Sequence, residues 1–311
     1  MFHLRDISDI IFHMDMIIGQ LLALVTASCW ACNSVAYRYL GQRMDSSFLA
    51  HVRMWMAVPL IMLISFTANR GFPSGVSTQT IIFLLLSGFF GYFVTDMLMF
   101  KAYVYLGSRE SLVILNLAPV ASAVISWFLF SEKLSLVQIL AIIMTISGIV
   151  IMVLDESKKS EKSKERPKAK LGIVLAVFGA LFQAVSYILA KYALSDIDAL
   201  SSNMLRNVGG LLAFIVYGFI FQKTFFSDMK VFKDRKLIWI LLISVMIGPV
   251  GGMTCQMQAM NLAPVGIVTA ISQVSPVLLL PVDRFILKKK LTAGSILGTI
   301  ISIIGVALLF I

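Results

Sequence analysis

Apolar residues in this chain come in long blocks separated by short polar stretches. An α-helix that crosses the hydrocarbon core of a membrane needs about 20 predominantly apolar residues. Ten blocks have roughly that length: 16–37, 48–68, 80–100, 109–130, 135–154, 171–192, 200–221, 237–257, 264–287 and 292–311. Because backbone groups in lipid must be satisfied within their own segment, such blocks predict helices. The pattern therefore predicts an all-α polytopic membrane protein with ten transmembrane helices.

Small and polar positions recur along the chain, which predicts two related halves. An offset of 157 residues pairs glycines and prolines of the two halves: Gly91 with Gly248, Pro119 with Pro276, and Gly148 with Gly305. Nearer the N-terminus the offset is 153 residues, which pairs Asp45 with Asp198. Five helices per half is an odd number, so the halves must lie in the membrane with opposite orientation.

These offsets predict a domain organisation with four parts. An N-terminal extension (1–15) precedes a first five-helix repeat (16–154). A charged linker (155–170) then leads to a second five-helix repeat (171–311). The extension carries aspartates and lacks a small-residue cleavage site, so a secretory signal is not expected.

The pentapeptide NLAPV occurs twice, but its two copies are not equivalent. Pro264 of the second copy stands in the first turn of a helix, where a missing N–H costs nothing. Pro119 of the first copy lies well inside a helix and should kink it, and its counterpart is Pro276. One turn before these two prolines stand the carboxamides Asn116 and Gln273.

Proline-interrupted helices at corresponding positions of inverted repeats point to the binding site of a transporter. We therefore expect Asn116 and Gln273 to line a central cavity, with Pro119 and Pro276 as kinks beside it. The alternative is that each amide ties its helix to a neighbouring helix.

Composition excludes several classes of protein. The chain is 59% hydrophobic and 14% charged, with a mean hydropathy of +0.92, whereas a soluble domain is about 25% charged. Three cysteines are too few for a disulfide framework, and Cys29 and Cys32 of CWAC lie within an apolar helix, where small packing residues are the expected role.

The residues indicate neither an enzyme nor a cofactor protein. The three histidines are not paired at ligand spacing with another ligand inside an apolar block, so we predict no catalytic residue and no metal site. No glycine-rich phosphate loop is present, so no nucleotide cofactor is expected. The net charge of +10 comes from loops and helix ends, which is typical of membrane anchors, and we expect no nucleic-acid partner.

The charges also predict an orientation. Of the 26 Lys and Arg residues, 21 fall on the side of the predicted linker and five on the other side. The positive-inside rule therefore puts the linker in the cytoplasm and both termini outside.

The chain resembles the drug/metabolite transporter superfamily, EamA type, over residues 17–311. The resemblance is carried by three stretches and one single residue, and the second half of the chain repeats their pattern. They are SCWACNS at 28–34, Arg53, GYFVTDMLMFKAYVYLGSRESLVILNLAPV at 91–120, and SEKLSLVQILAIIMTISGIVIM at 131–152. It implies a ten-helix fold and secondary transport of small metabolites, often amino acids and frequently outward. It also implies both termini inside, which conflicts with the charges.

This sequence departs from the family pattern at a few positions. The usual glutamate between the last two helices of a half is Glu132, but its counterpart is Lys289. Ala31 replaces a common glycine.

Further candidates for substrate contact lie on three helices, of which the first and sixth border the central cavity in this family. They are Trp30, Asn33 and Tyr37 on one face of the first helix, Gln183, Ser186 and Tyr187 near the equivalent positions of the sixth, and Gln256 of the eighth. The alternative for these side chains is packing between helices. Upstream of Gln256, the stretch GPVGG contains Gly248 and Pro249, a break that we predict to flex during transport.

Charged side chains within the apolar blocks are the remaining candidates. Asp96 could couple proton movement to transport, and an interfacial ion pair with Lys101 is the alternative. Arg53 and Arg206 are expected to extend to the membrane surface as anchors, with anion binding as the alternative. Glu110 requires no more than a favourable interaction with a helix N-terminus.

Small residues repeat along the fifth and tenth helices, so these two helices are expected to pack together. The stripes are Ala141, Thr145 and Gly148 on one helix, and Gly294, Gly298, Ser302 and Gly305 on the other.

The sequence thus favours a secondary active transporter that exports small metabolites, such as amino acids or related compounds, by alternating access. A passive channel or a membrane interaction scaffold remains the alternative. The expected partners are a small-molecule substrate, the lipid bilayer and a coupling proton or ion, in the cell (inner or plasma) membrane. Both a monomer and a homodimer are compatible with the sequence.

Overall fold

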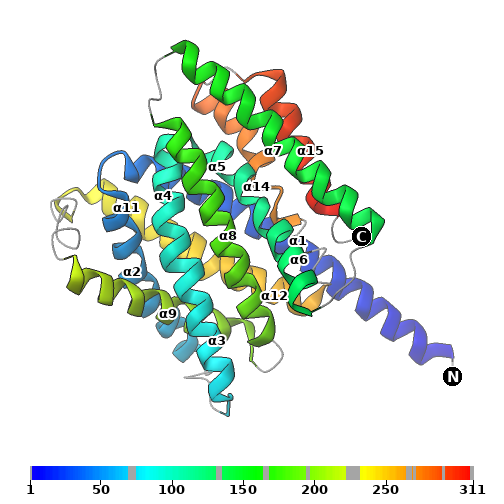
Figure 1. The fold of residues 1–311 in the computed structure, drawn as a ribbon. Helices are drawn as coiled ribbons and strands as arrows, with labels where there is room; N and C mark the ends of the chain where they lie inside the picture. The colour runs from blue at the N-terminus through cyan, green and yellow to red at the C-terminus, as the bar shows by residue number, and fades with distance from the viewer. Residues whose placement is uncertain are drawn as a thin grey trace.

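A computed structural model gives the arrangement of the chain. It describes residues 2–68, 75–130, 135–163, 168–193, 197–221, 232–263, 268, 271–288 and 291–308. All of the regular secondary structure within these ranges is helical (Figure 1). Glu132, Pro264 and Lys289 lie outside the described residues.

The first repeat consists of long helices, some of which are broken into shorter elements. They are α1 (Phe2–Gly41), α2 (Ser46–Thr67), α3 (Thr78–Gly88), the π-helix η1 (Phe89–Val94), α4 (Thr95–Tyr105), α5 (Ser108–Leu115), α6 (Leu117–Phe130) and α7 (Leu136–Ser163). Helix α1 includes most of the predicted N-terminal extension, and α7 continues into the predicted linker.

The second repeat follows the same order. Its elements are α8 (Ala169–Ala193), α9 (Ala199–Ile220), α11 (Arg235–Val245), the π-helix η3 (Met246–Gly252), α12 (Met253–Leu262), α14 (Ser275–Pro281), the π-helix η4 (Val282–Ile286) and α15 (Ala293–Leu308).

Within the described residues, eight spans are long and apolar enough to cross a membrane, and α15 is a shorter apolar helix. The ninth predicted helix, 264–287, includes residues outside the described ranges and ends as α14 and η4. Large hydrophobic side chains on the outer surface are exposed, as lipid contact requires, and Leu136 is 80% accessible. The chain is therefore an all-α polytopic membrane protein.

Equivalent aspartates begin the second helix of each repeat. The Asp45 carboxylate accepts hydrogen bonds from the backbone N–H groups of Ser47 (2.8 Å) and Phe48 (3.1 Å). The Asp198 carboxylate caps α9 in the same manner. A side-chain acceptor satisfies N–H groups that have no partner within the helix, so one sequence signal produces the same local structure twice.

The two repeats are also interrupted at equivalent places. Helix α5 ends before Asn116, and the turn at Gln273 precedes α14, 157 residues later. Both breaks lie three residues before a proline, Pro119 or Pro276, as predicted. The π-helices η1 and η3 likewise begin at positions 157 residues apart.

Helices α7 and α15 lie side by side along their length (Figure 1), which confirms the packing predicted from their small residues. A Cβ on Gly148 would lie 2.4 Å from the backbone nitrogen of Ser302. Such a close approach requires glycine.

Three arginines that entered the orientation count are buried rather than interfacial. Arg53, Arg109 and Arg206 are each no more than 1% accessible. Without them, the count of basic residues falls from 21 to 19 on the linker side and from five to four on the other side. The charge asymmetry survives, and the orientation stays a prediction.

Candidate substrate cavity

A cavity of about 60 Å³ lies between the two repeats. The first repeat lines it with α1, η1, α4 and α5, and the second with α8, α9, α12 and α14. Polar and aromatic side chains from both repeats converge on it. A cavity of this size holds only a few water molecules, so it must open further to admit a metabolite.

Equivalent positions of the two repeats take part in lining this cavity. Four pairs related by the sequence offsets line it: Trp30 and Gln183, Asp96 and Met253, Met99 and Gln256, and Leu115 and Ser272. Both repeats therefore contribute equivalent positions to the cavity, and the paired positions carry different chemistry.

Seven of the fourteen residues predicted to contact substrate, to couple transport or to act as hinges line the cavity. They are Trp30, Asp96, Gln183, Tyr187, Gln256, Gln273 and Pro276. The other seven, Asn33, Tyr37, Asn116, Pro119, Ser186, Gly248 and Pro249, are not among its lining residues.

Asn116 is fully buried away from the cavity. Its side-chain amide donates a hydrogen bond to Ser302 Oγ of α15 (3.3 Å). This contact ties the α5–α6 break to a neighbouring helix, as the alternative interpretation describes. Its repeat equivalent, Gln273, lines the cavity.

Asn33 and Ser186 occupy equivalent positions of α1 and α8, and each lies against a glycine of a π-helix. A Cβ on Gly248 would lie 1.7 Å from Asn33 Nδ2, and a Cβ on Gly91 would lie 2.5 Å from Ser186 Oγ. Through these contacts the first helix of each repeat packs against the π-helix of the other repeat, α1 against η3 and α8 against η1. A larger residue than glycine would push them apart.

Tyr37 packs in the core beside the lining residues. Its ring stacks on Phe100 with the ring centroids 4.4 Å apart. The Arg53 guanidinium lies 5.7 Å from the Tyr37 ring and 5.3 Å from the Phe100 ring. Aromatic faces attract cations, so Tyr37 contributes to the environment of Arg53.

Asp96 forms a buried ion pair with Arg53, not with Lys101 as the alternative supposed. The Arg53 side chain is fully buried, and the Asp96 side chain is 12% accessible. The expectation that Arg53 extends to the membrane surface was wrong, because a carboxylate and aromatic rings hold its charge inside the bundle.

Arg206, the repeat equivalent of Arg53, is also buried, and it lines the cavity. Its guanidinium donates to Ser87 Oγ (3.0 Å) and more weakly to Ser186 Oγ (3.4 Å), and it lies 5.3 Å from the Tyr92 ring. The expected surface anchor is thus a cavity residue, held by hydroxyl groups and an aromatic ring.

Asn203 joins the two π-helices. Its side-chain oxygen accepts a hydrogen bond from the Tyr92 hydroxyl of η1 (2.8 Å), and its amide donates to the carbonyl of Pro249 in η3 (2.8 Å). The predicted break at Gly248 and Pro249 is therefore a π-helix linked to its counterpart through α9. Nothing in the apolar pattern marked Asn203 as this link.

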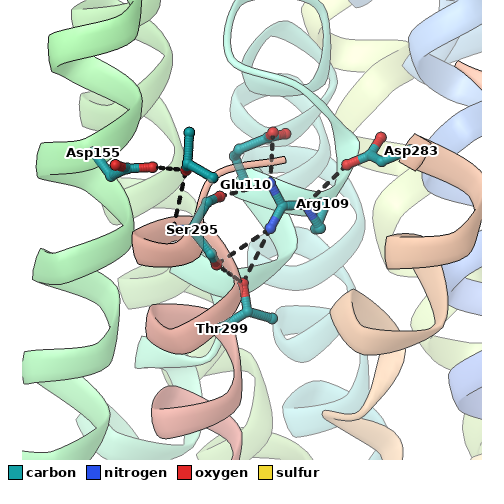
Figure 2. A network of polar contacts seen from close by, with 7 residues as sticks. Arg109, Glu110, Asp155, Asp283, Ser295 and Thr299 are labelled. Carbon is teal, nitrogen blue, oxygen red and sulfur yellow. Dashed lines mark hydrogen bonds and ion pairs between the residues drawn. The ribbon is translucent and has the colours of Figure 1, made fainter. Parts of the chain in front are cut away.

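A second buried polar network surrounds Arg109 and was missed by the sequence reasoning (Figure 2). The Arg109 guanidinium forms ion pairs with Asp283 (2.8 Å) and Glu110 (3.2 Å). It also donates to Ser295 Oγ (2.7 Å) and Thr299 Oγ1 (3.2 Å) of α15. The network connects α5 of the first repeat to η4 and α15 of the second.

Glu110 accordingly does more than face a helix N-terminus, because it is fully buried beside Arg109. Asp155 of α7 lies at one edge of the group drawn in Figure 2, and its carboxylate accepts a hydrogen bond from the Thr292 hydroxyl. In the part of the chain that the structure describes, no three His, Cys, Asp or Glu side chains gather in a way that could hold a metal ion.

Comparison with known proteins assigns the family. The model of the EamA-like transporter family matches this chain twice, over residues 17–154 and 170–311. The chain belongs to the EamA-like transporter family. This family lies within the drug/metabolite transporter superfamily, and its members are transporters, not enzymes.

Several relatives of this EamA-like chain are named as transporters. The uncharacterized transporter YetK of Bacillus subtilis is 20% identical over 73% of this chain and 69% of its own length. The uncharacterized inner membrane transporter YhbE of Escherichia coli is 32% identical over 43% of this chain and 42% of its own length. An uncharacterized transporter of Archaeoglobus fulgidus is 25% identical over 93% of this chain and 96% of its own length.

A solved structure described as "Crystal structure of protein" has the same fold. It matches with a TM-score of 0.64 and 15% identity, over 93% of this chain and 95% of its own. As a member of a transporter family, this chain is a multi-pass membrane protein that acts on a small-molecule substrate in a lipid environment.

Proposed function

We propose that this EamA-like chain is a secondary active transporter that exports small metabolites, such as amino acids or related compounds. The observation that carries the proposal is the central cavity, which repeat-equivalent positions line in pairs. Inverted-repeat transporters bind their substrate at such an interface and expose it to each side in turn. Gln183, Gln256 and Gln273 supply neutral hydrogen-bonding groups there, and Trp30 and Tyr187 supply aromatic surface.

Alternating access requires segments that bend, and the proposed segments are the helix interruptions. The breaks before Pro119 and Pro276 divide the fourth and ninth helices beside the cavity. The π-helices η1 and η3 contain Gly91 and the Gly248–Pro249 pair. Helices interrupted in this way are local hinge points. Rearrangement around these four places would open the cavity on one side and close it on the other.

Asp96 is the proposed coupling residue. Its carboxylate lines the cavity and pairs with a fully buried arginine, Arg53. Protonation of Asp96 would weaken this pair and leave the Arg53 charge less compensated, which links proton binding to the packing of α2 and α4. We expect Asp96→Asn to transport down a substrate gradient but to lose acceleration by an imposed pH gradient, measured in proteoliposomes. Unchanged acceleration would exclude Asp96 as the coupling residue.

The localisation and assembly are also proposals. The Escherichia coli relative is named an inner membrane transporter, which supports placement in the cell membrane. Both halves of the cavity come from one chain, so a monomer is sufficient for transport and a homodimer is not required by the site.

The experiment that tests transport compares the medium and the contents of expressing cells by untargeted mass spectrometry. The test variant is Gln183→Ala/Gln273→Ala, which removes one cavity amide from each repeat. The matched control is Gln42→Ala/Gln138→Ala, in which glutamines outside the cavity lining are removed. We expect a metabolite class that wild type and control export and the test variant does not.

The concentration dependence of that export separates a carrier from a channel. Export by a carrier saturates, because each cycle moves bound substrate, whereas flux that rises linearly with concentration would favour a passive channel. A profile indistinguishable from that of cells without the protein, across several growth conditions, would overturn the transport proposal and favour a scaffold.

A further inference from the structure

The charge balance around the cavity differs between the two repeats. In the first repeat, the Arg53 guanidinium pairs with the Asp96 carboxylate. In the second, the equivalent arginine is Arg206 and the residue equivalent to Asp96 is Met253. Arg206 Nη1 lies 3.4 Å from the Met253 sulfur. A thioether therefore occupies, in one repeat, the position that a carboxylate occupies in the other.

Arg206 has no carboxylate partner among the described residues. Its contacts are the Ser87 and Ser186 hydroxyls, the Met253 sulfur and the Tyr92 ring. The other two buried arginines, Arg53 and Arg109, each form at least one described ion pair with a carboxylate. A buried charge without a counter-charge is costly in a low-dielectric interior. An anionic ligand that paired with Arg206 would reduce this cost.

The two arginines also share one aromatic side chain. The Tyr92 ring lies 5.5 Å from the Arg53 guanidinium and 5.3 Å from the Arg206 guanidinium. Two positive charges therefore lie near one ring, and the Asp96 carboxylate is paired with only one of them. The cavity beside Tyr92 has a surplus of one positive charge, and one negative charge on a ligand would neutralise it.

We propose that Arg206 binds the carboxylate of the transported substrate, which would supply to Arg206 the counter-charge that Asp96 supplies to Arg53 in the first repeat. The guanidinium fork matches the two oxygens of a carboxylate. The substrate class is thus a small organic acid with a single carboxylate. The proposal rests on the proposed transport function and specifies which chemical group the cavity recognises.

The surplus of one charge favours a carboxylate over a phosphate monoester. A phosphate monoester carries more than one negative charge near neutral pH, so it would leave an excess of negative charge in the cavity. The neutral amides of Gln183 and Gln256 supply no further cation. A singly charged anionic group is therefore the best match.

The test uses the metabolite pool of expressing cells as its probe. Exported compounds are identified in the medium by mass spectrometry and sorted by whether they carry a carboxylate, a phosphate or neither. Four chains are compared at equal abundance in the membrane: wild type, Arg206→Gln, Met253→Asp, and the control Arg43→Gln, which changes an exposed arginine. The melting temperature of each purified chain shows whether a loss of export comes from unfolding.

The expected result is that wild type and the control export carboxylates. Arg206→Gln should lower the export rate of these carboxylates roughly 30-fold or more, because a buried charge partner of the substrate is lost. Met253→Asp should lower it as well, because the new side chain supplies the carboxylate that Arg206 then binds within the protein. Both variants should keep a folded chain.

Other outcomes overturn the proposal in distinguishable ways. Export by the wild type of phosphates, or of compounds with no anionic group, would retain transport and reject the carboxylate site. Carboxylate export unaffected by both Arg206→Gln and Met253→Asp would retain the substrate class and reject Arg206. Absence of any wild-type export would reject the transport function and the site with it.

Discussion

Arg109 and Arg206 are both buried guanidinium groups, but carboxylates surround the first and neutral groups surround the second. Arg109 lies between two carboxylates and two hydroxyls that come from both repeats (Figure 2). Arg206 is held by hydroxyls, a thioether and an aromatic ring. Arg109 lies outside the lining of the cavity, and Arg206 is part of it.

The difference indicates two uses of the same side chain. A buried arginine with counter-charges from neighbouring helices fixes those helices relative to one another. A buried arginine that lines a cavity and has no described counter-charge can pair with an anionic group of a ligand. Substitutions at the two sites should therefore separate stability from transport.

The largest loss of stability is expected from Arg109→Met. The variant removes the positive partner of the buried Asp283 and Glu110 carboxylates, and such a removal costs about 3–5 kcal/mol. The melting temperature of the purified protein in detergent measures this effect. Arg43→Met is the control: this exposed arginine has described contacts only with Tyr39, one turn away, so the variant should lower the melting temperature far less. A normal melting temperature for Arg109→Met would show that the network does not hold the helices together.

A smaller loss is expected from Thr299→Val. The Thr299 hydroxyl accepts a hydrogen bond from Arg109 (3.2 Å), and a hydrogen bond to a charged group contributes about 1.5–3 kcal/mol. Thr67→Val is a matched control, since Thr67 is exposed and bonds only its own helix among the described contacts. Equal melting temperatures for the two variants would contradict a stabilising role for the α15 hydroxyl.

Near Arg206, the variant Tyr92→Phe separates the role of the Tyr92 aromatic ring from that of its hydroxyl group. The variant keeps the aromatic ring near both guanidinium groups but loses the hydrogen bond to Asn203. We expect a loss of about 0.5–1.5 kcal/mol of stability and continued export. Abolished export in a stable Tyr92→Phe protein would mean that the link between the π-helices, rather than the ring, governs transport.

The smallest effect on stability is expected from Arg206→Met, within about 1 kcal/mol of the wild type because it leaves no carboxylate unpaired. The Ser87 and Ser186 hydroxyls, which lie 3.0 Å apart, still bond each other. Export should nevertheless be lost. A fall in melting temperature as large as that of Arg109→Met would remove the distinction between the two arginines.

The sequence predicted the architecture well, because that depends on local and repeated patterns. Lengths of apolar blocks predicted the helices, and Pro119 and Pro276 predicted the breaks at Asn116 and Gln273. Small residues predicted the contact between α7 and α15. Each of these signals is contained within one or two helices.

The charged residues were harder to predict, because their partners are distant in the sequence. Arg109 and Asp283 are separated by 174 residues, and no periodic pattern relates them. Arg53 and Arg206 stand near the beginnings of their apolar blocks, where an interfacial position was the natural expectation. The offset that pairs Asp96 with Met253 was visible, but its meaning depends on which arginine each residue faces.

The difference between Asp96 in the first repeat and Met253 in the second would also affect the direction of the proposed transport cycle. If the two repeats were identical, exchanging their conformations would convert an inward-facing protein into an outward-facing one of equal free energy. With aspartate at position 96 and methionine at position 253, this exchange moves an ion pair into a different environment, so the two states have different free energies. Under the proposed alternating access, the empty protein would face mainly one side of the membrane, and a bound acid that supplies the second negative charge would reduce the imbalance.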